Sequence, residues 1–141
     1  MTLSPIRVVC ADDNKSVLDA IAIRLAQEND LSLLFSLLQA DELVVRSKSA
    51  PPDVVVLDLD MPGLSPFDAI RTLAEEVGAA RVLIFSGHLS HTTIDRAIEA
   101  GVWGYVAKSD GEDELIQAIR SVYSGKFVLG PDVRLAIGQS A

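Results

Sequence analysis

Several residue types that support common protein functions are scarce in this sequence. It has a single cysteine, Cys10, which excludes a disulfide within the chain and fits a reducing compartment. Cys10 lies inside an apolar run and is expected to be a small buried core residue. The two histidines, His88 and His91, stand in no pattern typical of metal ligands. These scarcities argue against a disulfide-stabilised secreted module and against a zinc site.

Basic residues are also few, with 12 Lys and Arg against 20 Asp and Glu, so the net charge is −8 and the pI is about 4.6. This balance argues against a nucleic-acid surface within these residues, because phosphate binding needs clustered Lys and Arg. No apolar run approaches the ~20 residues of a membrane helix, and the first residues do not resemble a signal peptide. We therefore expect a cytoplasmic protein without membrane contact.

The remaining composition is that of a globular domain. Hydrophobic residues make up 49% of the 141 residues and charged residues 23%, which supports one domain with a substantial core. The excess of acidic residues can keep such a domain soluble. It also provides enough carboxylates to build a cation site.

The most informative stretch is DVVVLDLDMPG at residues 53–63. Its unbroken apolar run at residues 54–57 is typical of a strand buried on both faces, as in a parallel sheet between helices. Parallel sheets carry their functional groups in loops at the carboxyl ends of the strands. Asp58 follows the run directly. Alone, it is compatible with a nucleophile, a metal ligand or an ordinary turn residue.

The rest of the chain alternates strands with helices. We predict strands at residues 6–10, 31–37, 54–57, 80–85 and 104–107, and helices at residues 16–28, 41–49, 67–77, 92–100 and 112–123. The leucines of residues 31–37 leave that strand ambiguous with helix. This alternation indicates a flavodoxin-like α/β fold: a doubly wound, five-stranded parallel sheet in the order 2-1-3-4-5, with five helices.

In that strand order, polar side chains from four strand ends converge on one crevice. Asp12, Asp13 and Asp58 repel one another unless a cation joins them, and an all-oxygen site suits Mg²⁺. Ser86 and Lys108 follow the fourth and fifth strands, where a hydroxyl and an ammonium can bind phosphoryl oxygens. The chemistry that follows is attack of the Asp58 carboxylate on phosphorus to form an acyl phosphate.

Five features in matching order carry a family resemblance. They are Ala11-Asp12-Asp13, Asp58 followed by Met61-Pro62-Gly63, Ser86-Gly87, Tyr105 three residues before the lysine, and Lys108 itself. Over about residues 6–125 the chain resembles the receiver domain of a two-component response regulator. The strings DLDMPG, GYVAKS and SGKFVLGPDV are most similar to the group with a C-terminal helix-turn-helix effector.

The resemblance implies a role for each matched residue. Asp58 would be the phosphoacceptor, and Lys108 would pair with it and with its phosphate. Asp12 and Asp13 would hold Mg²⁺ together with Asp58, with the backbone carbonyl of Asp60 as a further ligand. No other cofactor is implied.

The resemblance also implies a switch. Ser86 would follow the phosphate and Tyr105 would turn inward behind it, remodelling the face formed by residues 92–100, 104–107 and 112–123. From the residues alone, Tyr105 as a static half-buried aromatic stays open. Ser86 replaces the commoner threonine and keeps the hydroxyl, and Ser109 stands where many members have proline.

The implied partner is a histidine kinase or a phosphotransfer protein, and a homodimer is compatible with the family. DNA contact would occur only through an effector domain outside this chain. We expect residues 1–125 to form the receiver domain and residues 126–141 a C-terminal tail or the start of a linker. The domain would not be an enzyme beyond slow autodephosphorylation.

Two alternatives remain at this point. Asp58-Leu59-Asp60 after an apolar strand imitates the DxD of haloacid-dehalogenase-like phosphatases, although those enzymes normally carry it on their first strand. The other alternative is a receiver-like module that binds partners without phosphorylation. The complete acidic set argues against it.

Overall fold

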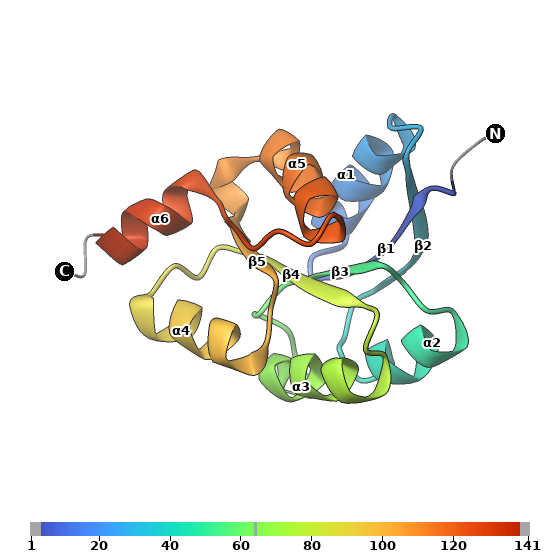
Figure 1. Cartoon of the computed structure of the whole chain (residues 1–141), viewed down its shortest axis with the longest axis horizontal. Coiled ribbons are helices and arrows are strands. Elements are labelled where there is room, and N and C mark those ends of the chain that lie inside the picture. The colour runs from blue at the N-terminus through green and yellow to red at the C-terminus, as the bar shows by residue number, and fades with distance from the viewer. Residues whose placement is uncertain (1–3, 64, 139–141) are drawn as a thin grey trace.

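A six-stranded parallel sheet lies between two layers of helices in the computed structural model, which describes residues 4–63 and 65–138. The strand order is β2-β1-β3-β4-β5-β6. Helices α1 and α5 cover one face, and α2, α3 and α4 cover the other (Figure 1). The strands are β1 (Ile6–Ala11), β2 (Leu31–Leu37), β3 (Val54–Leu57), β4 (Arg81–Ser86), β5 (Gly104–Ala107) and β6 (Val128–Leu129).

Some of the helix ends show clear capping chemistry. The helices are α1 (Lys15–Ala26), α2 (Leu43–Ser49), α3 (Pro66–Glu76), α4 (His91–Ala100), the short 3-10 helix η1 (Lys108–Asp110), α5 (Glu112–Tyr123) and α6 (Pro131–Gly138). Asn14 caps α1 by accepting hydrogen bonds from the backbone N–H groups of Ser16 and Val17. Gly101 ends α4 with φ 108°, a left-handed conformation that suits glycine. None of the helices in the described ranges is long and apolar enough to cross a membrane.

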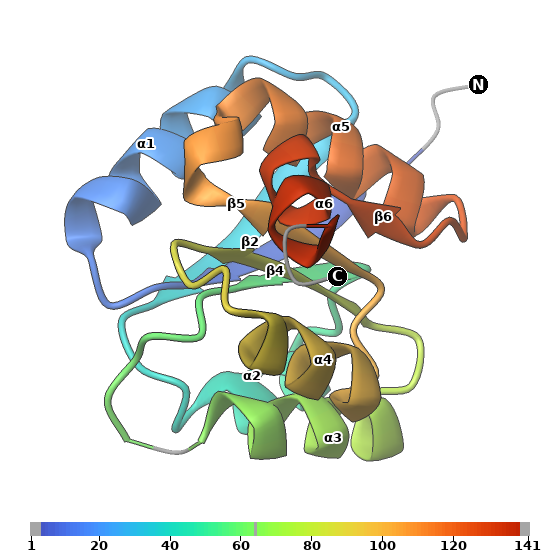
Figure 2. The ribbon, with the colours of Figure 1, turned by 90° about the vertical axis from the view of Figure 1, so that its left-hand side faces the viewer.

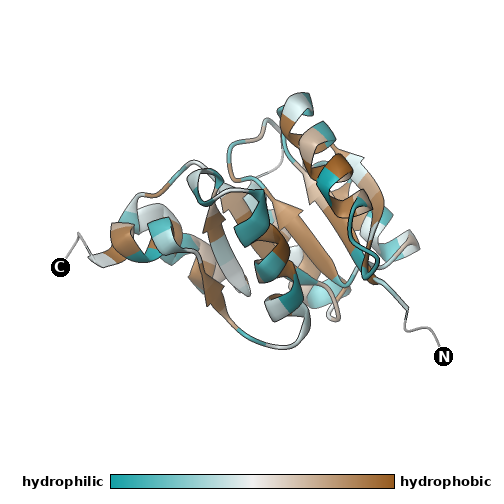
Figure 3. Cartoon of the chain, turned by 90° about the horizontal axis from the view of Figure 1, so that it is seen from above, coloured by the Kyte–Doolittle hydropathy of each residue, from teal (hydrophilic) through white to brown (hydrophobic). Residues whose placement is uncertain are grey.

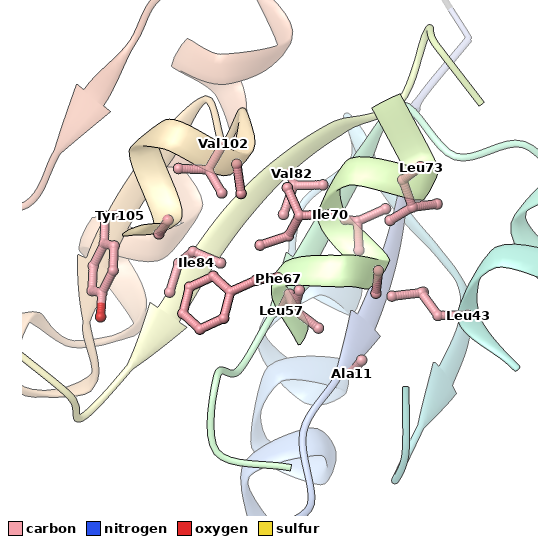
Figure 4. Packing of buried hydrophobic residues seen from close by; sticks show 14 of the residues in the cluster. Ala11, Leu43, Leu57, Phe67, Ile70, Leu73, Val82, Ile84, Val102 and Tyr105 are labelled. Carbon is pink, nitrogen blue, oxygen red and sulfur yellow. The ribbon is translucent and has the colours of Figure 1, made fainter. Parts of the chain in front are cut away.

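The core consists of two apolar layers, one on each face of the sheet. Alternate residues of each strand point to opposite faces, so Val9 and Ala11 enter one layer while Val8 and Cys10 enter the other. Figure 4 shows the first layer, where Phe67 and neighbouring side chains of α3 pack on the central strands. Figure 3 shows mostly brown strands beneath helices that carry both teal and brown residues. The packing fixes the strand register and hence the strand ends.

The predicted order of the first five strands is confirmed, but the prediction of five strands and five helices is wrong. The structure has a sixth strand, β6, paired with β5, and a sixth helix, α6, which buries Val133 completely. A two-residue strand is too short to give a periodic pattern. The division into a receiver domain and a tail at residue 125 stays a prediction, although β6 continues the sheet and α6 packs beside it.

Arg81 links three elements at the amino-terminal end of the sheet. Arg81, at the start of β4, donates to the carbonyl oxygens of Val122 (2.8 Å) and Tyr123 (2.9 Å) at the end of α5. Its Cζ also lies 4.4 Å from the ring centroid of Trp103, which is partly buried. Arg81 therefore ties β4, α5 and the start of β5 at the end opposite Asp58.

Candidate functional site

Backbone hydrogen bonds place the predicted acidic residues at neighbouring strand ends. Ala11 pairs with Leu57 in the ladder between β1 and β3. One residue further on, the N–H of Asp58 donates to the carbonyl of Ala11 at 2.9 Å. The N–H of Asp12 donates to the carbonyl of Leu37 at 3.0 Å. Asp12 and Asp58 are thereby fixed side by side at the carboxyl edge of the sheet.

Three carboxylates converge at this edge. Asp12, Asp13 and Asp58 each offer one oxygen, and these oxygens all lie within 4.8 Å of one another. Asp12 is 3% exposed and Asp58 2%, whereas Asp13 is exposed to solvent. The group is therefore exposed to solvent mainly through Asp13.

Lys108 is the cation that the fold brings to these carboxylates. Its Nζ lies 2.9 Å from Asp12 Oδ2 and 3.4 Å from Asp58 Oδ2. Lys108 begins η1 directly after β5, where Ala107 pairs with Ser86 of β4. Five residues predicted from separate strand ends thus lie at one edge: Asp12, Asp13, Asp58, Ser86 and Lys108.

The pKa shifts show that this group is short of positive charge. Burial raises the pKa of the Asp58 carboxyl above its usual value, and the nearby Asp12 raises it further. Lys108 and the N–H of Asp60 oppose this rise without cancelling it. Burial by itself would lower the pKa of Lys108, but the contacts with Asp12 and Asp58 have a larger effect and raise it. A further cation would favour the ionised form of Asp58.

The carboxylates fit a divalent ion of the Mg²⁺ type by their chemistry. Three carboxylates and one ammonium have a formal charge of −2, and every ligand offered is oxygen. Asp13 is exposed and has room to bind an ion that keeps part of its water shell. The structure therefore supports an acidic cluster that could hold Mg²⁺.

Ser86 and Tyr105 lie behind the acidic cluster and share one neighbour, His88. Both side chains are fully buried. The N–H of His88 donates to Ser86 Oγ at 3.1 Å, and the phenol of Tyr105 donates to the carbonyl of His88. Burial raises the pKa of Tyr105 to about 12, against the lowering effect of a hydrogen bond with Ser86. Tyr105 is therefore in an inward position, beside Ile84 in the core layer (Figure 4).

Asp60 and His88 approach each other across the mouth of the site. His88 Nε2 lies 3.7 Å from Asp60 Oδ2, and both side chains are more than half exposed. The backbone N–H of Asp60 also donates to Asp58 Oδ1 at 3.3 Å. This last contact orients the Asp58 carboxyl and brings the backbone of Asp60 to the predicted metal position.

The strand order, the acidic cluster and the lysine after β5 all have counterparts in one family. Residues 8–120 match the model of the response regulator receiver domain. The chain belongs to this family. It is thus a receiver domain of the two-component response regulator type, a class of signal transducers. No observation favours the phosphatase or the phosphorylation-independent alternative.

The relatives of this receiver domain include a transcriptional regulatory protein and a response regulator. The chain is 30% identical over 128 residues to the transcriptional regulatory protein DesR of Bacillus subtilis (strain 168), covering 91% of this chain and 63% of DesR. It is also 30% identical over 128 residues to the response regulator GacA of Pseudomonas viridiflava, covering 91% of this chain and 60% of GacA. The chain thus spans about three-fifths of the length of these relatives.

A solved structure supports the same placement. The crystal structure of a LuxR-family two-component response regulator from Aurantimonas sp. SI85-9A1 superposes with a TM-score of 0.90 at 31% identity. The alignment covers 97% of this chain and 98% of that one. The likeness includes nearly all of the present chain, so it extends beyond the 8–120 match.

Sequence reasoning missed one residue beside the site. The Asp110 carboxylate accepts from the N–H of Ala107, immediately before Lys108, and from the N–H of Asp132 at the start of α6, both at 2.9 Å. The run Gly130-Pro131-Asp132 was the available signal, because Pro at the first position and Asp in the first turn are typical of a helix start. It predicts a helix after residue 130, which Asp110 could then anchor.

Proposed function

We propose that Asp58 accepts a phosphoryl group, with Mg²⁺ held by Asp12, Asp13, Asp58 and the backbone carbonyl of Asp60. The observation that carries this proposal is the convergence of two buried carboxylates and one exposed carboxylate on the Lys108 ammonium. Burial without full charge compensation is costly for a structural site. It is useful for a site that awaits a cation and a phosphoryl group.

The proposed reaction is a direct phosphoryl transfer. An Asp58 oxygen attacks phosphorus of a phosphohistidine, the P–N bond breaks, and the electron pair leaves with the imidazole, which takes up a proton. The product is an acyl phosphate on Asp58. Lys108 Nζ would hold one phosphoryl oxygen as a compact charge, and Ser86 Oγ would donate to another. Bound Mg²⁺ would supply neutralisation of the charge on the transferring oxygens.

The response would pass to the face formed by α4, β5 and α5. Ser86 and Tyr105 both contact His88 in the loop between β4 and α4. A hydroxyl drawn toward a phosphoryl group would therefore pull on the same loop that holds Tyr105. We propose that these two residues form the switch.

The partners follow from the chemistry. A histidine kinase or phosphotransfer protein would supply the phosphoryl group, in the cytoplasm, and the domain would show no catalysis beyond slow autodephosphorylation. DesR is a transcriptional regulatory protein, and the chain spans about three-fifths of it, so an effector domain outside these residues would make any DNA contact. The net charge of −8 supports the absence of a DNA surface here. A homodimer remains a prediction.

The test is treatment of the chain with a small phosphodonor, such as acetyl phosphate, in the presence of Mg²⁺. We expect the intact mass to increase by one phosphoryl group that is stable to acid, labile to base, and absent when Mg²⁺ is chelated. Asp58→Asn should abolish the gain, whereas Asp60→Asn, with its exposed side chain, should retain it. Equal modification of Asp58→Asn and the wild type would refute the assignment.

A further inference from the structure

The segment after α5 closes the β5 edge of the sheet. Leu129 of β6 pairs with Tyr105, and the N–H of Gly130 donates to the carbonyl of Tyr105 at 2.9 Å. The following helix, α6, buries Val133 completely in the same apolar layer that contains Tyr105. Figures 1 and 2 both place α6 beside the β5 edge, between α5 and α4. Part of the face proposed for output is therefore occupied by the chain itself.

A polar connection ties the start of α6 to the turn that carries Lys108. Asp110 accepts hydrogen bonds from the N–H groups on both sides, those of Ala107 and Asp132. Ser109 Oγ also lies 2.5 Å from Asp132 Oδ2. A Cβ added at Gly130 would collide with the Asp110 carboxylate. The start of α6 is thus anchored by residues of η1, and the first residue of η1, Lys108, contacts Asp58.

The docked helix restricts the side chain of Tyr105. Tyr105 lies on the same side of the sheet as Leu129 and Val133, and it is fully buried with its phenol bound to the His88 carbonyl. Side chains move between staggered rotamers. β6 and α6 pack in the same apolar layer as the Tyr105 ring, along the edge of the sheet next to β5. A docked α6 should therefore favour the inward position of Tyr105.

We propose that α6 is an internal ligand of this receiver, coupled to Asp58 so that docking of α6 and loading of Asp58 favour each other. The coupling runs through inward Tyr105 and through the Ser109-Asp110-Asp132 connection to Lys108. This inference rests on the proposed function, in which inward Tyr105 accompanies the phosphoryl group. Because such coupling is reciprocal, docking strengthens loading by the same factor by which loading strengthens docking, so a variant that undocks α6 loses at most that factor in loading. Loss of the phosphoryl group would then free the β5 edge for a partner.

The test uses the full chain with beryllofluoride and Mg²⁺ as a mimic of the phosphoryl group. Hydrogen exchange of the amides of residues 128–138 should slow when the mimic binds. Gly130→Ala and Val133→Ala should lower the affinity for beryllofluoride by about fivefold or more, in the usual range of allosteric coupling. Leu135→Ala is the matched control, because Leu135 lies on the same helix with 62% exposure. It should leave the affinity unchanged.

A milder variant covers the case in which Val133→Ala destabilises the whole fold. Ser109→Ala removes only the hydroxyl next to Asp132, so it should lower the affinity in the same direction while the urea midpoint stays close to the wild type. Suppose that beryllofluoride binds, that hydrogen exchange over residues 128–138 is unchanged or faster, and that all variants bind beryllofluoride as tightly as Leu135→Ala. The coupling is then refuted, and the proposed function stands. If neither beryllofluoride nor phosphodonor acts on Asp58, the proposed function fails and the coupling fails with it.

Discussion

Replacement of Asp58 by asparagine should stabilise the protein when no divalent cation is present. Asp58 is 2% exposed, and burial together with Asp12 raises its pKa above the ordinary value of 3.8. A carboxyl whose pKa is higher in the folded state destabilises the fold once it is ionised. The penalty is absent below about pH 3.8, grows as the pH rises through the raised pKa, and is complete above it. The amide of an asparagine side chain carries no such charge.

The expected magnitude follows from the distances. At an effective dielectric constant of about 20, Lys108 at 3.4 Å attracts Asp58 by about 5 kcal/mol, and Asp12 within 4.8 Å repels it by at least about 3.5 kcal/mol. The difference of about 1.5 kcal/mol is smaller than the several kcal/mol that burial of a carboxylate costs. If burial costs about 3 kcal/mol, at the low end of that range, the uncompensated part is about 1.5 kcal/mol. We therefore expect Asp58→Asn to gain about 1.5 kcal/mol, which is about 0.8 M in urea midpoint for a slope near 2 kcal/mol/M.

The assay is urea unfolding in EDTA and in Mg²⁺ at about pH 7. Mg²⁺ at 100 times its dissociation constant stabilises a folded site by about 2.7 kcal/mol. The variant lacks one of the proposed ligands, so Mg²⁺ should reverse the order of stability and make the wild type the more stable protein. This reversal distinguishes a carboxylate that binds a cation from a buried carboxylate that only destabilises the fold.

Two results would refute this reasoning. One is an equal urea midpoint for Asp58→Asn and the wild type in EDTA. The other is an advantage of the variant that stays constant from about pH 4 to pH 7, since the effect must follow ionisation of Asp58. Asp60→Asn is the control: its side chain is 76% exposed, so its midpoint should change by less than about 0.5 kcal/mol equivalent.

Three further predictions concern neighbouring groups. Lys108→Ala leaves Asp12 and Asp58 without their ammonium, so urea unfolding in EDTA should show a loss of about 2–4 kcal/mol, partly restored by Mg²⁺. Burial raises the pKa of the Cys10 thiol to about 12, so a thiol reagent at neutral pH should label Cys10 only as fast as the protein unfolds. Rapid labelling in the absence of urea would contradict this prediction. The pKa of Tyr105 is raised to about 12, so the fold loses stability as the pH rises above about 10. Tyr105→Phe should lose less stability in this pH range. In an alkaline absorbance titration, the variant should lack the tyrosine ionisation step that occurs at the highest pH.

The strand ends were predictable because two strong local signals agree. The unbroken apolar runs stop abruptly at Asp12, Asp58, Ser86 and Lys108, and the handedness of crossover connections leaves few ways to order the strands. Chain topology then brings distant residues to one edge without any knowledge of side-chain geometry. The fold and the membership of the site rest on these two rules.

Finer features depend on distances that no pattern encodes. Lys108 lies closer to Asp12 (2.9 Å) than to Asp58 (3.4 Å), a ranking set by the exact course of η1. The approach of His88 to Asp60 likewise depends on two loop conformations. The β6 strand has only two residues, so its pairing with β5 is determined by tertiary contacts rather than by periodicity.

The position of Trp103 has a practical consequence for spectroscopy. This residue, the sole tryptophan in the sequence, precedes β5, whereas Lys108 follows it. Five steps along the strand, at about 3.3 Å each, separate the backbone of Trp103 from that of Lys108 by about 16 Å. With Arg81 stacked on its ring, the indole should change its emission when the fold melts and stay nearly silent when an ion or phosphoryl mimic binds. Tryptophan fluorescence will therefore report unfolding with or without Mg²⁺. Binding of an ion or phosphoryl group at the aspartates has to be measured by hydrogen exchange or mass spectrometry.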